Sequence, residues 1–168
     1  MFGSFAFTIF VMTINIDFMN DNKTLLQLFN FQFVNFEKEI MQTPEEHLWR
    51  IMPGIRNSIG HLCLHICGNL RHFIGKESGG IDYVRDRERE FNSPAIEKNL
   101  LLDEIKTTGQ TVEKVLSKLS PEILEEQIII SFLPFSLTKG QFIIHLLSHM
   151  AYHIGQINYL RRILAGTQ

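Results

Sequence analysis

TKGQFIIHLLSHMAYHIGQINYLRRILAG, residues 138–166, is the stretch that decides the fold. Thr138 and Gln141 have the spacing of a capping box, which starts a helix, and Gly166 is a typical residue just beyond a helix end. Between them, apolar residues recur at helical spacing. The sequence therefore predicts a long final helix, and a helix of this length is typical of a helical bundle.

Toward the N-terminus, apolar periodicity and capping signals predict three more long helices, over residues 24–41, 56–74 and 93–119. The second should end at Gly75, and Ser93-Pro94 should open the third. Residues 127–137 are rich in branched and aromatic side chains and contain a proline, which favours an extended or hairpin-like connection. We expect an all-α four-helix bundle with an irregular or short β connection before the last helix.

Bulk composition describes one ordinary globular domain. The 168 residues are 45% hydrophobic and 20% charged, and 16 basic against 18 acidic residues leave a formal charge of −2. This balance lacks the basic face with which proteins bind nucleic acid, so we expect no nucleic-acid partner. Cys63 and Cys67 lie about one helical turn apart, a poor geometry for a disulfide. Buried free thiols fit a reducing compartment, and we expect a cytoplasmic protein.

Residues 1–23 are predicted to be an N-terminal extension to a domain over residues 24–168. The extension is apolar and has no charged residue before Asp17. It is too short and interrupted for a membrane span and lacks the features of a signal peptide, so we expect no membrane partner. Either the true start is Met12 or Met19, or the segment packs on the domain as an extra strand or helix.

The final helix carries three histidines on one face. At about 100° per residue, His145 and His153 lie about 40° to either side of His149, and Gln156 shares the same stripe.

The helix predicted over residues 56–74 repeats this pattern. His61 and His72 lie within about 40° of His65, and Asn69 lies about 40° to the other side. Two such stripes that face each other in a bundle could converge on one ion.

Histidine chemistry favours a metal site at this convergence. His149 and His153, one turn apart, can present two imidazoles to one ion, and His65 from a neighbouring helix would complete a set of three nitrogens. Three protein nitrogens leave one coordination position open, as in catalytic zinc sites. Neutral imidazole suits zinc, nickel, iron or copper, and sequence alone does not choose among them.

Other residues on the stripes have less specific roles. Asn69, Gln156 and Tyr152 are candidates to hydrogen-bond the ligands, although each is equally a polar core residue. Histidines held by hydrogen bonds in a core would produce the same stripes without a metal. The alternative ligands or lining residues are His61, His72 and His145.

These helices resemble the signature helices of the DinB-like (YfiT-like) metalloenzyme family. There the last helix carries two histidines four residues apart and a Gly-Gln soon after, as at His149, His153 and Gly155-Gln156. The earlier helix contributes one histidine, at the position of His65 rather than of His61. The segment GGIDYVRDREREF, residues 79–91, resembles the glycine pair and Arg-x-Arg-x-x-Glu-Phe of a DinB-like subfamily of unknown function.

The resemblance spans residues 24–166 and implies an up-down-down-up bundle that forms a homodimer. It implies three histidines on a zinc- or nickel-like ion, with iron as a further candidate. Arg85 and Arg87 become candidates to hold an anionic group of a small-molecule substrate near the ion. Characterised relatives include transferases and isomerases that use a low-molecular-weight thiol.

Four functions are compatible with these sequence features. The favoured one is a metalloenzyme whose ion deprotonates a low-molecular-weight thiol for S-transfer. A metal-dependent hydrolase comes second, because neither histidine stripe carries a carboxylate to act as general base. The others are a non-enzymatic metal-binding or stress protein and a bundle whose histidines are only polar core groups.

Overall fold

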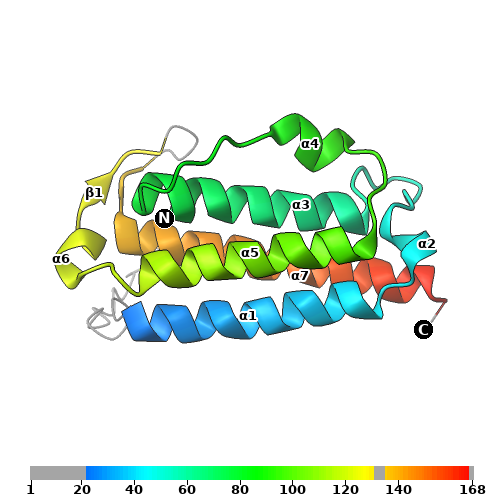
Figure 1. Cartoon of the computed structure of the whole chain (residues 1–168), viewed down its shortest axis with the longest axis horizontal. Coiled ribbons are helices and arrows are strands. Elements are labelled where there is room, and N and C mark those ends of the chain that lie inside the picture. Colours follow the sequence, from blue (N-terminus) through cyan, green and yellow to red (C-terminus); the bar gives the residue numbers. More distant parts are fainter. Residues whose placement is uncertain (1–21, 131–134, 167–168) are drawn as a thin grey trace, which may run out of the picture.

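The computed structural model describes residues 22–130 and 135–166, which form a bundle of four long helices (Figure 1). The fold prediction is confirmed, and only the last two residues of the predicted extension, 22 and 23, lie within the described part. The long helices are α1 (Asn22–Gln42), α3 (Ile59–Leu70), α5 (Lys98–Leu116) and α7 (Lys139–Leu164). The shorter ones are α2 (Glu45–Leu48), α4 (Arg87–Asn92) and α6 (Pro121–Leu124), and α3 continues as the π-helix η2 (Arg71–Ser78).

The helices run in the predicted up-down-down-up order: α1 and α7 run one way, and α3 and α5 run the other way (Figure 1). Both α1 and α3 pack against α5 and α7, so α1 and α3 lie diagonally across the bundle. α4 lies along α3 on the side away from α1 (Figure 1). Because α5, α7 and α4 all cover α3, His61 is the one residue of α3 that is not buried.

Large apolar side chains at helical spacing form the core between the four helices. Each such side chain, when fully buried, stabilises the fold by about 1.5–3 kcal/mol. Members with 1% exposure or less include Phe29, Phe36 and Ile40 of α1, Ile66 and Leu70 of α3, Leu101 and Leu116 of α5, and Met150 and Ile157 of α7.

The connection before the last helix contains the predicted short β element. β1 (Gln127–Ile128) pairs antiparallel with β2 (Leu137–Thr138). The Thr138 side chain then accepts a hydrogen bond from the Gln141 backbone (3.1 Å), and the Gln141 side chain accepts one from the Thr138 backbone (2.9 Å). This is the predicted capping box, and α7 begins directly after it.

Two predicted helix boundaries are wrong. The second long helix does not end at Gly75 but continues through Ser78, and the chain turns at Gly80, whose φ is +64°. Directly after η2 the chain passes close to α5, where a Cβ on Gly79 would collide with Val115.

The other wrong boundary is the start of the third long helix, which is Lys98 rather than Ser93-Pro94. Trp49 Nε1 donates a hydrogen bond to the Ile96 carbonyl (2.9 Å), and His61 Nε2 lies 3.2 Å from the Ser93 carbonyl oxygen. In a helix, the carbonyls of Ser93 and Ile96 would accept hydrogen bonds from backbone amides one turn later. Here they contact side chains instead, and the segment stays outside the helix.

Cys63 and Cys67 are free and buried, as predicted. Burial and a hydrogen bond with Cys67 raise the pKa of the Cys63 thiol. Across residues 22–130 and 135–166, none of the helices combines the length and apolarity that crossing a membrane requires.

The Glu39 carboxylate connects α1 to α7. It is 9% exposed and accepts hydrogen bonds from Arg161 Nε (2.7 Å) and Asn158 Nδ2 (2.9 Å). We expect Glu39→Ala to lower the free energy of unfolding by about 1–3 kcal/mol, because two partly buried donors lose their acceptor. Urea denaturation measures the change, and Glu37→Ala, which removes an exposed carboxylate from the same helix, is the control. Equal effects in the two variants would show that the link does not stabilise the bundle.

Candidate metal centre

Three histidine rings converge where α3 faces α7. His65 comes from α3, and His149 and His153 come from consecutive turns of α7. His149 Nε2 lies 3.4 Å from His65 Nε2 and 3.1 Å from His153 Nε2. One nitrogen from each ring lies within 4.8 Å of the other two. The structure thus brings together the three residues that the two stripes predicted.

Glu90 determines which nitrogen of His65 carries the proton. Glu90 Oε2 lies 2.9 Å from His65 Nδ1, and the glutamate is only 3% exposed. Burial raises the pKa of Glu90, but hydrogen bonds from His65 and Arg85 outweigh burial, and the pKa falls below its usual value. An ionised carboxylate only accepts hydrogen bonds, so Nδ1 carries the proton. A neutral His65 therefore turns the lone pair of Nε2 toward the other two rings.

Gln156 has the same effect on His153. Gln156 Nε2 donates to Tyr152 Oη (3.0 Å), which leaves Gln156 Oε1 to accept from His153 Nδ1 (2.7 Å). Gln156 thus contacts a predicted ligand directly, and Tyr152 orients Gln156. The lone pair of His153 Nε2 consequently also faces the centre of the cluster.

His149 and His153 are uncharged at neutral pH. Burial, followed by the nearby His153 and His65, lowers the pKa of His149 to about 4. Burial also lowers the pKa of His153, although its hydrogen bond to Gln156 partly opposes the shift. A neutral His149 carries at most one proton on Nε2, so it cannot donate fully to both lone pairs that face it.

A divalent ion fits this arrangement of donors. Two nitrogens that bind a tetrahedral zinc at 2.0–2.1 Å lie about 3.3 Å apart, which agrees with the 3.1 and 3.4 Å separations in the cluster. Hydrogen bonds from the non-ligating nitrogens to a carboxylate and an amide are the usual supports of metal-binding histidines. The residues present therefore suit a three-nitrogen site with a further position open.

The position of Glu90 depends on close contacts around α4. Arg85 Nε donates to Glu90 Oε1 (2.6 Å) and Arg85 Nη2 donates to Oε2 (2.9 Å). A Cβ on Gly68 of α3 would collide with Glu90 Oε1, so the glycine makes room for the carboxylate. The histidine stripes gave no indication of Glu90, which is 25 residues from His65. The Glu-Phe of the motif at residues 79–91 is the one signal that could have revealed it.

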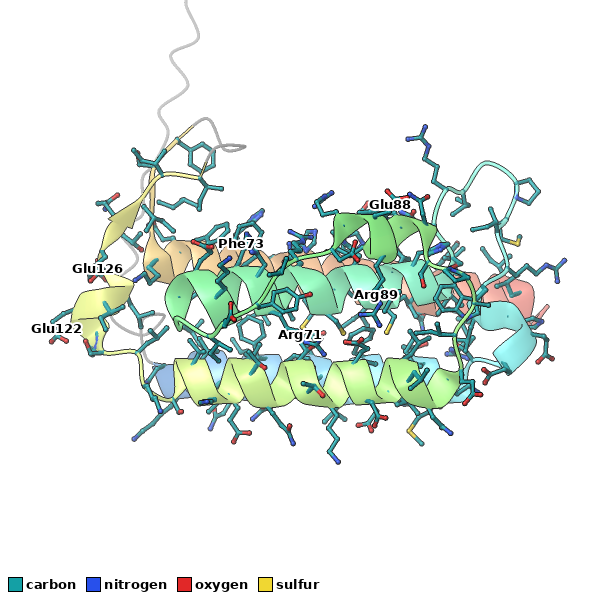
Figure 2. All side chains as sticks on the ribbon, turned by 45° about the horizontal axis from the view of Figure 1, so that its top comes forward. Arg71, Phe73, Glu88, Arg89, Glu122 and Glu126 are labelled. Carbon is teal, nitrogen blue, oxygen red and sulfur yellow. The ribbon has the colours of Figure 1, made fainter. Side chains whose placement is uncertain are left out.

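One ion pair holds α4 against α5. Glu104 Oε1 of α5 lies 2.6 Å from Arg89 Nη2 of α4, and Glu104 Oε2 lies 2.6 Å from Arg71 Nη2 of η2. Figure 2 shows Arg89 projecting from α4 toward α5, with Glu88 on the outer side of the helix. The helix that carries Glu90 is thus anchored at a second point.

The two predicted arginines occupy different surroundings. The guanidinium of Arg85 is 10% exposed and is engaged by Glu90. Arg87 lies over the ring of Phe91, 5.4 Å from its centroid, and the Phe91 ring is 5.0 Å from that of His65. Both residues lie near the cluster, and a role for either in holding an anionic group stays a prediction.

The remaining predicted residues lie outside the cluster. His61 belongs to the capping box of α3 with Ser58. His145 stacks on Phe142, with its ring 6.5 Å from that of His149, and His72 packs against Phe73. Asn69 is buried, and its Oδ1 accepts no hydrogen bond within the described part of the chain.

Comparisons with known proteins agree with this fold. A family model described as "Protein of unknown function (DUF1572)" matches residues 17–168. A DinB-like protein from Bacillus cereus is 19% identical in sequence, with a TM-score of 0.67 over 87% of this chain and 93% of that one. A conserved protein from Enterococcus faecalis is 18% identical, with a TM-score of 0.69 over 86% of this chain and 97% of that one. No curated protein matches.

We expect Glu90→Gln to weaken zinc affinity about 10–100-fold, because the amide cannot support the His65 ring as a buried carboxylate does. Competition with a chromophoric chelator measures the affinity. The control is Glu88→Gln, the same change at an exposed position of α4. Unchanged affinity in Glu90→Gln would contradict the assigned role of Glu90.

We expect the metal-free protein to lose stability as the pH falls from about 6.5 toward 4. The folded-state pKa of His149 is about 4, below the ordinary value of 6.5, so the unfolded chain binds this proton first on acidification. Urea denaturation with chelator present, at several pH values, measures the slope. His149→Gln removes this titration and should flatten the slope, and an unaltered slope would refute the assignment.

Proposed function

This chain belongs to DUF1572, a DinB-like family of proteins of unknown function, and from that premise we propose that it is a metal-dependent enzyme that activates a low-molecular-weight thiol for S-transfer. The main support is the convergence of three Nε2 atoms, from His65, His149 and His153. Hydrogen bonds from the opposite nitrogens of two of these rings direct their lone pairs inward.

The donor set suits zinc or nickel, with iron as a further candidate. When bound, such an ion supplies a Lewis acid at which a thiol loses its proton near neutral pH. We propose a thiol as the substrate because this chain resembles a family whose characterised members use low-molecular-weight thiols.

The side chains of this chain prepare the site for that chemistry. Glu90 and Gln156 hold two imidazoles in the tautomer whose lone pairs face inward. Burial lowers the pKa values of His149 and His153, so a metal does not have to displace an imidazolium proton from either ring at neutral pH. In the transfer, a bond forms between the thiol sulfur and an electrophilic carbon, the leaving group departs with its electron pair, and the thiol proton passes to solvent.

The position of Glu90 favours thiol activation over hydrolysis. Hydrolysis would require a general base to take a proton from the attacking water. Glu90 is the carboxylate that the structure brings to the cluster, but His65 and Arg85 occupy both of its oxygens. A carboxylate engaged in this way serves as a support for His65 and is a poor proton acceptor for water.

The proposal is tested by thiol alkylation with untagged protein that carries one equivalent of zinc or nickel. The probe thiols are N-acetylcysteine, 2-mercaptoethanol and cysteamine, which differ in charge, and bimane fluorescence follows their reaction with monobromobimane. We expect a rate above that of the free thiol that falls to background with EDTA and returns when metal is restored. His65→Ala should abolish the acceleration, whereas His145→Ala, which removes a histidine outside the cluster, should preserve it.

Two results would contradict the proposal. A rate that does not depend on metal with any probe thiol would exclude thiol activation. Stoichiometric metal without acceleration would favour a non-enzymatic metal-binding protein.

A further inference from the structure

A cavity of about 580 Å³ lies between the loop of residues 52–57 and the C-terminal half of α7. Leu62 of α3 forms part of its wall, and Tyr159, Leu160 and Ile163 form its α7 side. Its volume falls within the range of small-molecule sites, which are commonly apolar with a few polar groups.

Gln156 connects this cavity to the histidine cluster. The Gln156 side chain lines the cavity, and its Oε1 accepts the hydrogen bond from His153 Nδ1 at 2.7 Å. Leu62 stands one helical turn before His65 on α3. The cavity therefore adjoins the proposed metal centre, and a molecule that reacts at the centre could extend into it.

The one charged residue of the cavity lining is Arg56. Arg56 is exposed and forms no ion pair within the described residues. Arg85, in contrast, is neutralised by Glu90. The cavity thus combines an apolar interior with one unneutralised positive charge, which complements a molecule with an apolar body and an acidic group.

We propose that this cavity binds a small amphipathic acid, a carboxylate or sulfonate on an apolar body, as the substrate class of the histidine site. The apolar body would pack against Leu160 and Ile163, and the acidic group would pair with Arg56. The substrate role depends on the proposed function, whereas binding itself requires no metal.

The test uses two probes with nearly the same apolar body. 1-Anilinonaphthalene-8-sulfonate carries an acidic group, and N-phenyl-1-naphthylamine does not. Fluorescence titration of the full chain, excited beyond tryptophan absorption, measures both affinities and the stoichiometry. We expect one molecule of the sulfonate per chain, bound at least tenfold more tightly than the neutral probe.

Two substitutions locate the bound probe. Ile163→Trp places a larger side chain in the cavity and should weaken sulfonate binding at least tenfold. Leu100→Trp is the matched control on α5, since Leu100 is 50% exposed and Ile163 is 46% exposed. Arg56→Gln should remove the preference for the sulfonate and leave the neutral probe within twofold. Thermal unfolding verifies that each variant is folded.

A metal-site variant separates this proposal from the proposed function. His149→Ala/His153→Ala should bind the sulfonate within twofold of the parent, so the cavity can be confirmed even if the thiol chemistry fails. Absence of binding, or equal binding by the parent and Ile163→Trp, would overturn the proposal. A change of oligomeric mass in Ile163→Trp on sedimentation would overturn it as well, because the cavity would then be a contact between copies of the chain.

Discussion

Three imidazole nitrogens that face one another set the main constraint on this molecule. Glu90 and Gln156 accept hydrogen bonds from the Nδ1 atoms of His65 and His153. The Nε2 atoms of these two neutral rings therefore face the centre of the cluster as acceptors. His149 has one proton at most to give them there. The lowered pKa values of His149 and His153 exclude charging of these two rings at neutral pH. A divalent cation would satisfy all three nitrogens, and the separations of 3.4 and 3.1 Å from His149 Nε2 suit such an ion.

The packing of the other helices positions these three rings and Glu90. α3 and α7 run antiparallel, which brings His65 opposite two turns of α7 (Figure 1). Gly68 lets α4 approach α3 closely enough for Glu90 to reach His65. Arg89 and Glu104 anchor α4 to α5, and Arg85 offsets the charge of the buried glutamate. Removing one partner from a buried polar network lowers the stability of the fold more than removing one partner of an exposed pair. The members of this network therefore depend on one another.

Helical periodicity predicted much of this from sequence, because the histidines repeat along the same faces that build the bundle. The sequence predicted the long helices and the capping box at Thr138. It also predicted that His65 would meet His149 and His153. Glu90 was not predicted, because its contact with His65 depends on the path of an irregular segment that has no periodicity. The late start of α5 also escaped prediction, since it depends on the tertiary hydrogen bond from Trp49 to Ile96.

The most direct test of the central claim is the metal content of untagged protein by elemental analysis, beside His149→Ala/His153→Ala and His145→Ala. We expect close to one zinc, nickel or iron per chain in the parent and in His145→Ala, and none in the double variant. A metal-free parent that also fails to take up added divalent ions would contradict it. The histidines would then be polar side chains in the interior of a helical bundle.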